Sequence, residues 1–386
     1  MQQFFRNFFK RLLIFINVLT ALLFITSSLT PHFDPRNWWF SGFLGLLFPY
    51  LLAGVCFFIV FWLFVTPKRI ILNIFCLLAA IPAIKNFLPF NFAAPFAVEK
   101  KDSTLRVMSW NIRRFTAFDA KNFNPNQLAN KPAIFAEIKK YNPDVLCLQE
   151  FFTTTDVNNN IRQIQQELGF RWFVFAKDNH QQYRHLSGTA IFSKYPIVDS
   201  MILTYPDSMA RAAENVIAAD IVVHSDTVRI FTLHLQSFGF RPRDYTSFGK
   251  IKAQQDTNLV ASKNLFRKMK QTFYLHAFQA DYLKENISKS PHPVIACGDL
   301  NDVPNSYAYH TVRSRMNDCF LERGTGFGKT FTSTTSRVLN ILPTLRIDYI
   351  FADPVWETRQ FTRMQRKLSD HNALIVDLVK MENNEK

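Results

Sequence analysis

The stretch VIACGDLND, at residues 294–302, joins an apolar run to a turn that carries acid and amide groups. Its first residues are the small and β-branched types that are typical of a buried strand. Asp299 and Asn301 lie two residues apart, so in an extended chain both side chains point to the same side. Such a pair can hold a cation or a phosphate, although Asp and Asn also follow strands simply as turn formers.

Five other segments repeat this arrangement, in which an apolar run carries acid, amide or imidazole groups. They are MSWNIRR at 108–114, LCLQE at 146–150, FTLHLQ at 231–236, RIDYIF at 346–351 and LSDHNALIVDL at 368–378. Ligands of open α/β sheets bind at the ends of the strands, so we expect these polar groups to gather at one edge of a sheet. A divalent cation and a phosphate can be held there, which predicts hydrolase chemistry.

Glu150 follows the apolar run DVLCLQ, at what we expect to be the end of a strand. A carboxylate in that position is costly unless it is solvated or bound to a cation. Mg²⁺ prefers oxygen ligands and needs only one or two carboxylates together with the substrate phosphate. We therefore predict that Glu150 binds Mg²⁺, and Mn²⁺ is the alternative metal.

Two histidines lie close to acids or inside apolar runs. His371 follows Asp370, and His234 interrupts an apolar alternation. A single histidine in a strand is more often a hydrogen-bonded structural residue than a catalyst. Two of them beside several acids favour catalysis, because phosphoryl hydrolysis needs a positioned base and cationic donors for the developing charge.

Strand-like and helix-like segments alternate after residue 103, which predicts an α/β fold. Strands are expected at 104–112, 144–150, 171–176, 188–193, 215–223, 227–235, 293–299, 346–351 and 373–379. Helices are expected near 126–140, 158–168 and 257–287. The last helix has one apolar face and a basic remainder, so we interpret it as the cover of a sheet in preference to a nucleic-acid surface.

Long uncharged, apolar runs occupy most of the first hundred residues, at 12–33, 37–67 and 70–84. A bilayer core about 30 Å thick needs roughly 20 apolar residues in a helix, so the first two runs can span it and the third is marginal. The alternatives are buried helices of a soluble core, which suit the third run best, and a cleaved signal peptide. We expect an uncleaved anchor, because no small-residue cleavage site follows the first run and a second run comes after it.

This pattern predicts an all-α transmembrane anchor before the α/β part. We expect the anchor at 1–90 with spans at about 12–30, 41–66 and 70–88, a linker at 91–103, a catalytic domain at 104–380 and a tail at 381–386. Lys and Arg concentrate in the N-terminal tail and in the turn TPKR at 66–69, which favours a cytoplasmic location for both. With three spans, the catalytic domain of this multi-pass inner- or plasma-membrane protein is periplasmic or otherwise extracytoplasmic.

The formal net charge of +15 suits anionic partners such as nucleic acid or lipid head groups, without choosing between them. The segment SFGFRPRDYTSFGKIK, at 237–252, interleaves aromatic and basic residues. Such residues can stack on unpaired bases or lie at a membrane interface over anionic lipid. We expect this loop to border the active site, and the alternative is a loop that folds onto the neighbouring helix.

Seven motifs, taken together, resemble the endonuclease/exonuclease/phosphatase superfamily. In chain order they are MSWNIRR, LQE, SGTAIFSKYPI, LHLQ, GDLND, RIDYIF and SDH. The superfamily includes pancreatic-type deoxyribonucleases, abasic-site endonucleases, neutral sphingomyelinases and inositol polyphosphate 5-phosphatases. The resemblance covers about 104–380 and implies a four-layer α/β sandwich, with two mixed sheets between outer helices and a metal-dependent site at one sheet edge.

The resemblance also implies roles for individual residues. Glu150 resembles the principal metal ligand of the family, with Asn111 beside it on the metal or the phosphate. Asp370 resembles a metal-site acid. Asp299 resembles the residue that orients or deprotonates the attacking water, and Asn301 would steady the phosphate.

The two histidines also have counterparts in the family. His371 resembles the catalytic histidine, and Asp348 resembles the carboxylate that fixes its tautomer. His234 matches a second histidine of the deoxyribonuclease and sphingomyelinase branches, which donates to the phosphate. The abasic-site branch lacks it, so the chain resembles that branch less. In deoxyribonucleases an acid pairs with this second histidine. Here the segment before SGTAIFSKYPI offers only Asp178, so Arg184 or His185 is the alternative contributor.

The residues and the resemblance together predict a membrane-anchored, Mg²⁺-dependent phosphoesterase of nuclease type that hydrolyses phosphodiester, or alternatively phosphomonoester, bonds. A phosphodiesterase for phospholipid head groups, as in sphingomyelinases, is the first alternative. A catalytically silent binding module tethered to the membrane is the second. A transporter or channel built from the N-terminal helices is disfavoured, because no ionisable residue lies in the middle of a span.

Overall fold

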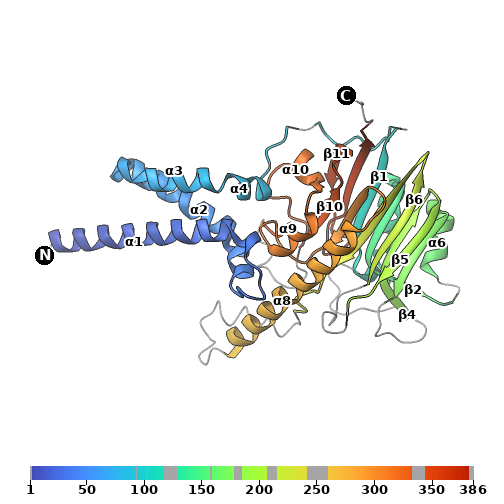
Figure 1. Cartoon of the computed structure of the whole chain (residues 1–386), viewed down its shortest axis with the longest axis horizontal. Helices are drawn as coiled ribbons and strands as arrows, with labels where there is room; N and C mark the ends of the chain where they lie inside the picture. The colour runs from blue at the N-terminus through green and yellow to red at the C-terminus, as the bar shows by residue number, and fades with distance from the viewer. Residues whose placement is uncertain are drawn as a thin grey trace.

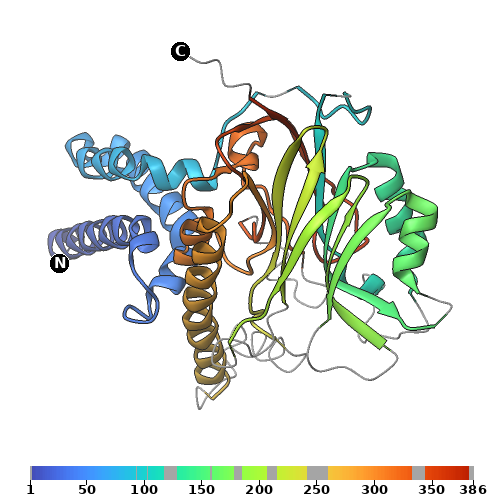
Figure 2. The same ribbon diagram turned by 45° about the vertical axis from the view of Figure 1, so that its right-hand side comes forward.

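Two six-stranded β-sheets face each other in the computed structural model, and helices cover both outer faces (Figures 1 and 2). The structure describes residues 2–92, 94–101, 103–116, 128–156, 159–177, 185–206, 215–240, 260–332 and 344–381. This arrangement confirms the four-layer α/β sandwich, and it is preceded by long apolar helices as the sequence predicts.

The first sheet has the strand order β11-β12-β1-β2-β4-β3. Its strands are β1 (Leu105–Asn111), β2 (Val145–Thr154), β3 (Trp172–Lys177), β4 (His185–Ser193), β11 (Trp356–Arg363) and β12 (Leu374–Lys380). The pair β1–β2 is parallel and the other pairs are antiparallel, so the sheet is mixed. Helices α5 (Lys131–Tyr141) and α6 (Asn160–Leu168) cover its outer face.

The second sheet has the order β5-β6-β7-β8-β10-β9. Its strands are β5 (Ile197–Leu203), β6 (Val216–Val223), β7 (Asp226–His234), β8 (Val294–Asp299), β9 (Asn317–Asp318) and β10 (Asp348–Ala352). Here β7–β8 is the parallel pair, and the others are antiparallel. The outer face is covered by α8 (Val260–Ser288) and α9 (Tyr307–Arg313), while the short α10 (Cys319–Arg323) follows β9.

The core between the sheets consists of β-branched and small side chains, such as Val107, Ile191, Ile230 and Ile295, all of them fully buried. Two further apolar clusters join each sheet to its helices. Burial on both faces explains why the central strands appear in the sequence as continuous apolar runs.

Three strands are absent from the sequence-based expectation. Most side chains of β5 are exposed, β11 lies at a sheet edge, and β9 has only two residues. None of them needs a continuous apolar run, because at least one of their sides faces solvent or a loop. The helices α9 and α10 are also unanticipated, and both are too short to show a periodic apolar face.

The N-terminal helices project away from the sheets (Figure 1). They are α1 (Gln2–Ser28), α2 (Ser41–Val65), α3 (Ile70–Ala79) and α4 (Ile81–Phe87), with one-turn helices η1 (Thr30–His32) and η2 (Pro67–Arg69) between them. Within the described residues, α1 and α2 are long and apolar enough to cross a membrane. The pair α3–α4 is bent by 65° at its break, so it is either a broken span or a re-entrant loop.

The segment predicted as a linker packs against the sheets. The side chain of Asn91 donates to the carbonyl oxygens of Leu321 and Gly324 at 2.8 Å. Further along, the guanidinium of Arg106 donates to the carbonyl oxygen of Val98 at 2.6 Å. These contacts join the segment to α10, to the residue that follows it and to β1.

Candidate active site

The register of the central strands brings three predicted site residues to one edge of the second sheet. Asp299 ends β8, where it pairs with His234 at the end of β7 and with Asp348 at the start of β10. Gly298 makes the β7–β8 approach possible, because a Cβ atom there would lie 2.0 Å from the carbonyl oxygen of Leu233. Any side chain at this position would therefore push His234 away from Asp299.

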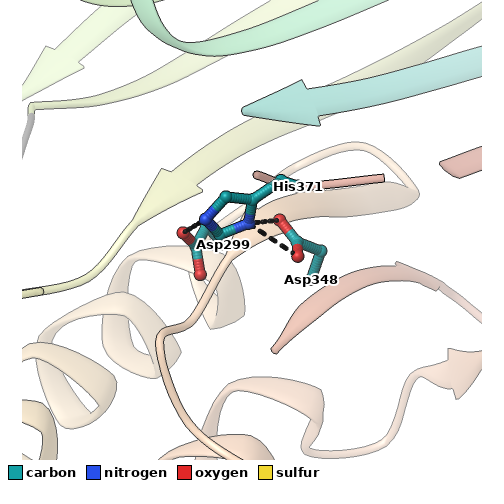
Figure 3. A group of neighbouring side chains, drawn as sticks. All are labelled: Asp299, Asp348 and His371. Atoms are coloured by element: carbon teal, nitrogen blue, oxygen red, sulfur yellow. Dashed lines mark hydrogen bonds and ion pairs between the residues drawn. The ribbon is translucent and has the colours of Figure 1, made fainter. Parts of the chain in front are cut away.

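His371 lies between two carboxylates (Figure 3). Its Nδ1 atom is 2.9 Å from Oδ2 of Asp348, and its Nε2 atom is 3.6 Å from Oδ2 of Asp299. Burial alone would lower the pKa of His371, but Asp348 and Asp299 together raise it well above its usual value. The two carboxylates therefore favour the protonated form of the imidazole, and Nε2 faces Asp299.

Asp299 lies at the centre of the site and is buried. Burial raises its pKa to about 6, Asp348 adds to this effect, and the two nearby histidines oppose it. His234 approaches the same Oδ2 atom with its Nε2 at 3.7 Å. A carboxyl group with a pKa near neutrality is suited to accept a proton and to release it again.

Two amides fix the position of Asp299. Asn111, at the end of β1, donates from Nδ2 to Oδ2 of Asp299 at 3.2 Å and to Oε1 of Glu150 at 3.3 Å. The backbone N–H of Asn301 donates to Oδ1 of Asp299 at 2.8 Å, and its side-chain amide donates to the carbonyl oxygen of Leu235 at 3.1 Å. Asn301 therefore contacts the acid through its backbone, whereas the spacing in GDLND predicts that the two side chains point to the same side.

Glu150 does not end a strand, contrary to the sequence-based expectation. Strand β2 continues to Thr154, and its register shifts between Leu148 and Phe151, which indicates a β-bulge. Glu150 occupies this bulge with a φ angle of 47°. Bulges redirect side chains next to active sites, and this one turns the carboxylate toward the pocket that also contains His234 and His371.

Glu150 and Asp370 form the acidic side of the site. Burial alone raises the pKa of Glu150, but His234, Arg114 and His371 outweigh burial and lower it, so this carboxylate is charged. Burial raises the pKa of Asp370, and the charge of Glu150 adds to that effect. Both carboxylates are partly buried and line the same cavity, and oxygen donors of this kind suit a hard divalent cation.

A different group of three residues also has the geometry of a metal site. One ligand atom from each of Asp299, Asp348 and His371 lies within 4.8 Å of the others. Because Nδ1 of His371 already bonds Asp348, we interpret this group as a catalytic acid–base set.

These residues line a cavity of about 430 Å³. Its polar lining includes Glu150, His234, Asp299, Asn301, Asp370 and His371. The cavity therefore brings together most of the residues that the sequence singled out. Its apolar lining includes Phe238 and Phe240, so the start of the predicted aromatic and basic loop borders the site. The remainder of that loop lies outside the described residues. Arg184 and Asp178, which belong to another segment, also lie outside them.

Sequence reasoning missed a second buried His–Asp pair, which adjoins the site. On α8, His276 lies 3.1 Å from Oδ2 of Asp302 through Nδ1 and 2.7 Å from the carbonyl oxygen of Gln236 through Nε2. These contacts join the segment after β7 to the turn after β8. The only sequence signal was that Asp302 completes GDLND, since His276 is separated from it by many residues.

Comparisons with known proteins agree with this geometry. The model of the Endonuclease/Exonuclease/phosphatase family matches residues 108–371, and the chain belongs to this family. The fold is therefore of the phosphoesterase and nuclease type. A second family model, a domain of unknown function (DUF8431), matches residues 10–87.

Solved structures with the same fold include an endonuclease/exonuclease/phosphatase from Beutenbergia cavernae DSM 12333, with 20% identity, a TM-score of 0.53 and coverage of 72% of each chain. The catalytic domain of human Nocturnin with a bound sulfate anion has 18% identity and a TM-score of 0.50, covering 73% of this chain and 97% of that one. At these identities the similarity concerns the fold alone. No curated protein matches the chain.

Proposed function

We propose that this chain is a membrane-anchored, divalent-metal-dependent phosphodiesterase. The observation that carries the proposal is that His234, from the end of β7, and His371, from the segment before β12, converge on Oδ2 of Asp299. They do so in a cavity that also holds Glu150 and Asp370. A base, cationic donors and acidic ligands are the groups that phosphoryl hydrolysis requires.

In the proposed reaction Asp299 accepts the proton of the attacking water, since its pKa of about 6 allows it to act near neutral pH. A bond forms between the water oxygen and phosphorus, and the bond to the departing oxygen breaks. His371, kept charged by Asp348, donates a proton to the departing oxygen. His234 and Asn301 also line the cavity, where they would donate to the phosphate.

Glu150 and Asp370 would hold the metal, with Asn111 positioning Glu150. When bound, Mg²⁺ or Mn²⁺ neutralises charge on the nonbridging oxygens of the phosphate. The side-chain oxygen of Asn111 accepts a bond from the backbone N–H of Arg113 at 3.1 Å. The amide of Asn111 therefore orients the carboxylates of Glu150 and Asp299. We assign direct metal contact to Glu150 and Asp370.

We further propose that α1, α2 and the bent pair α3–α4 insert in a membrane with the catalytic domain outside the cytoplasm. The basic N-terminal tail and the Lys68–Arg69 turn lie at the ends of α1 and α2 that are remote from the sheets (Figure 1). Basic residues of that kind are retained on the cytoplasmic side. Three crossings would then leave the sheets on the opposite side.

The test uses the full-length protein, purified in detergent, with a panel of phosphodiesters. The panel contains bis(p-nitrophenyl) phosphate, single- and double-stranded DNA, RNA and phospholipid vesicles, each with Mg²⁺, Mn²⁺ or EDTA. The proposal expects turnover of at least one diester with metal, its loss in EDTA and its recovery when Mg²⁺ is added back. Turnover that is unaffected by EDTA would refute the metal requirement, and no turnover of any diester would favour a silent binding module.

A further inference from the structure

We infer that α2 forms one wall of the active site, and that the substrate is a bilayer lipid carrying a phosphodiester, which enters the pocket from the membrane. This inference rests on the phosphodiesterase function proposed above and names its substrate class. Leu46, Leu47 and Tyr50 of α2 line the same cavity as Asp299 and His371. A helix that is apolar enough to span a bilayer is thus part of the catalytic pocket.

The wall is firmly attached to the catalytic domain. Gly42 lies so close to the ring of Phe273 on α8 that a Cβ atom there would be 2.4 Å from the ring. One residue later, Phe43 stacks on Phe266 with ring centroids 4.8 Å apart. Before α2, Arg36 forms an ion pair with Asp281 on α8 at 2.5 Å.

The turn that follows the catalytic strand also rests on the anchor. Val303, four residues after Asp299, is buried in the same apolar cluster as Phe24 and Phe48. The hydroxyl of Thr30 donates to the carbonyl oxygen of Asn305 at 2.6 Å. The anchor therefore supports the loop that follows the catalytic acid, in addition to closing one side of the pocket.

The length of α2 places this wall near the boundary between the hydrocarbon core and the lipid head groups. Its 25 residues extend about 38 Å at 1.5 Å per residue, whereas the hydrocarbon core is about 30 Å thick. About five residues, 41–45, therefore emerge from the core when the remainder spans it, and Leu46 and Leu47 lie at its edge. Leu47 is 47% exposed and Tyr50 is 41% exposed, so both are available to a molecule in the pocket.

Aromatic and basic residues beside the wall fit a membrane interface. Trp38 and Trp39 directly precede α2 and are 51% and 44% exposed. The ammonium of Lys270 on α8 lies 5.5 Å from the ring centroid of Trp39. Trp residues favour the interface, and a cation beside them attracts lipid phosphates.

The apolar part of the pocket suits the chain of a lipid. Among the described residues that line this cavity, Leu46, Leu47, Met269, Leu345 and Ile347 provide aliphatic surface. One phosphate at the catalytic acids and an apolar chain against α2 match this distribution.

The test compares two substrates of the full-length protein with Mg²⁺: vesicles of phosphatidylcholine and phosphatidylglycerol, and soluble bis(p-nitrophenyl) phosphate. Leu47→Ser makes the wall polar, Leu47→Met retains its apolar surface, and Leu44→Ser is the matched control, since Leu44 lies one turn earlier on α2 and does not line the pocket. We expect Leu47→Ser to lose at least ten times more activity on vesicles than on the soluble diester. Leu47→Met and Leu44→Ser should keep the wild-type ratio of the two activities.

The outcomes separate this inference from the proposed function. If the wild type hydrolyses the soluble diester or DNA but neither vesicle lipid, the lipid inference is wrong and the phosphodiesterase proposal stands. Equal losses of Leu47→Ser on both substrates would also overturn the inference. If the wild type hydrolyses no diester at all, both proposals fail.

Discussion

The Nδ1 atom of His371 and the Oδ2 atom of Asp348 are 2.9 Å apart, although the two residues belong to different sheets. Asp348 starts β10 of the second sheet, and His371 lies just before β12 of the first. The bond fixes the ring so that Nε2 faces Asp299. We predict that Asp348→Asn lowers kcat about as much as His371→Ala, since an imidazole without its carboxylate loses its charge and orientation. Steady-state kinetics on a soluble phosphodiester measures both losses.

The double variant is the control for this prediction. If Asp348 and His371 act as a unit, the Asp348→Asn/His371→Ala enzyme is little worse than either single variant. Losses that simply multiply would show that the two residues act independently.

A buried ion pair stabilises the first sheet and the segment that leads to it. Arg106 and Asp377 pair at 2.6 Å with 0% and 2% of their side chains exposed. We predict that Asp377→Ala lowers the free energy of unfolding by about 3–5 kcal/mol, because a buried guanidinium loses its partner. Asp226→Ala, which breaks an exposed pair with Lys380, should cost less than about 1 kcal/mol. Chemical denaturation measures the free energy of unfolding of both variants. Equal losses would contradict the prediction that the buried Arg106–Asp377 pair contributes more than the exposed pair.

His310 makes the junction between anchor and domain sensitive to acid. Its Nε2 atom lies 3.1 Å from the side-chain amide of Asn86 on α4. Burial, with Arg313 and His32, lowers its pKa to about 4. Between pH 4 and the ordinary histidine value of 6.5, the unfolded chain binds a proton that the folded chain does not, so stability is full above this window and falls as the pH decreases.

His310→Asn removes this titration and leaves an amide that can still meet Asn86. Between pH 7 and pH 4.5 we predict a smaller decrease in Tm for His310→Asn than for the wild type. The two decreases should differ by roughly 2 °C or more. The exposed His224 supplies the control. For His224→Asn, the decrease in Tm from pH 7 to pH 4.5 should equal that of the wild type. Parallel curves for wild type and His310→Asn would show that His310 does not titrate in this range.

The proposed topology predicts opposite results for two fusions. A reporter fused after Pro67 follows two crossings and should behave as cytoplasmic, whereas one fused after Val98 follows α3–α4 and should behave as periplasmic. The bend of 65° makes the α3–α4 crossing the step that most needs testing. The same side for both fusions would mean that α3–α4 is re-entrant and that the catalytic domain is cytoplasmic.

Sequence predicted the strand-end residues well, because their positions follow from local pattern. Asn111, His234 and Asp299 each end a buried strand, and pairing of neighbouring strands brings such ends together. The sandwich itself follows from the continuous apolar runs of strands buried on both faces.

Features that depend on distant contacts could not be predicted. The bulge at Glu150 is set by the pairing of β2 with β4, and nothing in LCLQE indicates that the strand continues. His276 and Asp302 meet only after α8 packs against the second sheet. The contribution of α2 to the pocket is of the same kind, since an apolar run indicates a span without showing what one of its faces touches.

The most direct test of the central claim is the turnover of bis(p-nitrophenyl) phosphate with Mg²⁺ by the wild type, by Asp299→Asn and by Glu150→Gln. Each variant keeps the size of its side chain and removes a charge that is needed once substrate and metal are bound. We predict that both fold as the wild type does and that each lowers kcat roughly 10²–10⁴-fold. If either folded variant retained more than about a tenth of the wild-type rate, the assignment of this site as the phosphodiesterase centre would be contradicted.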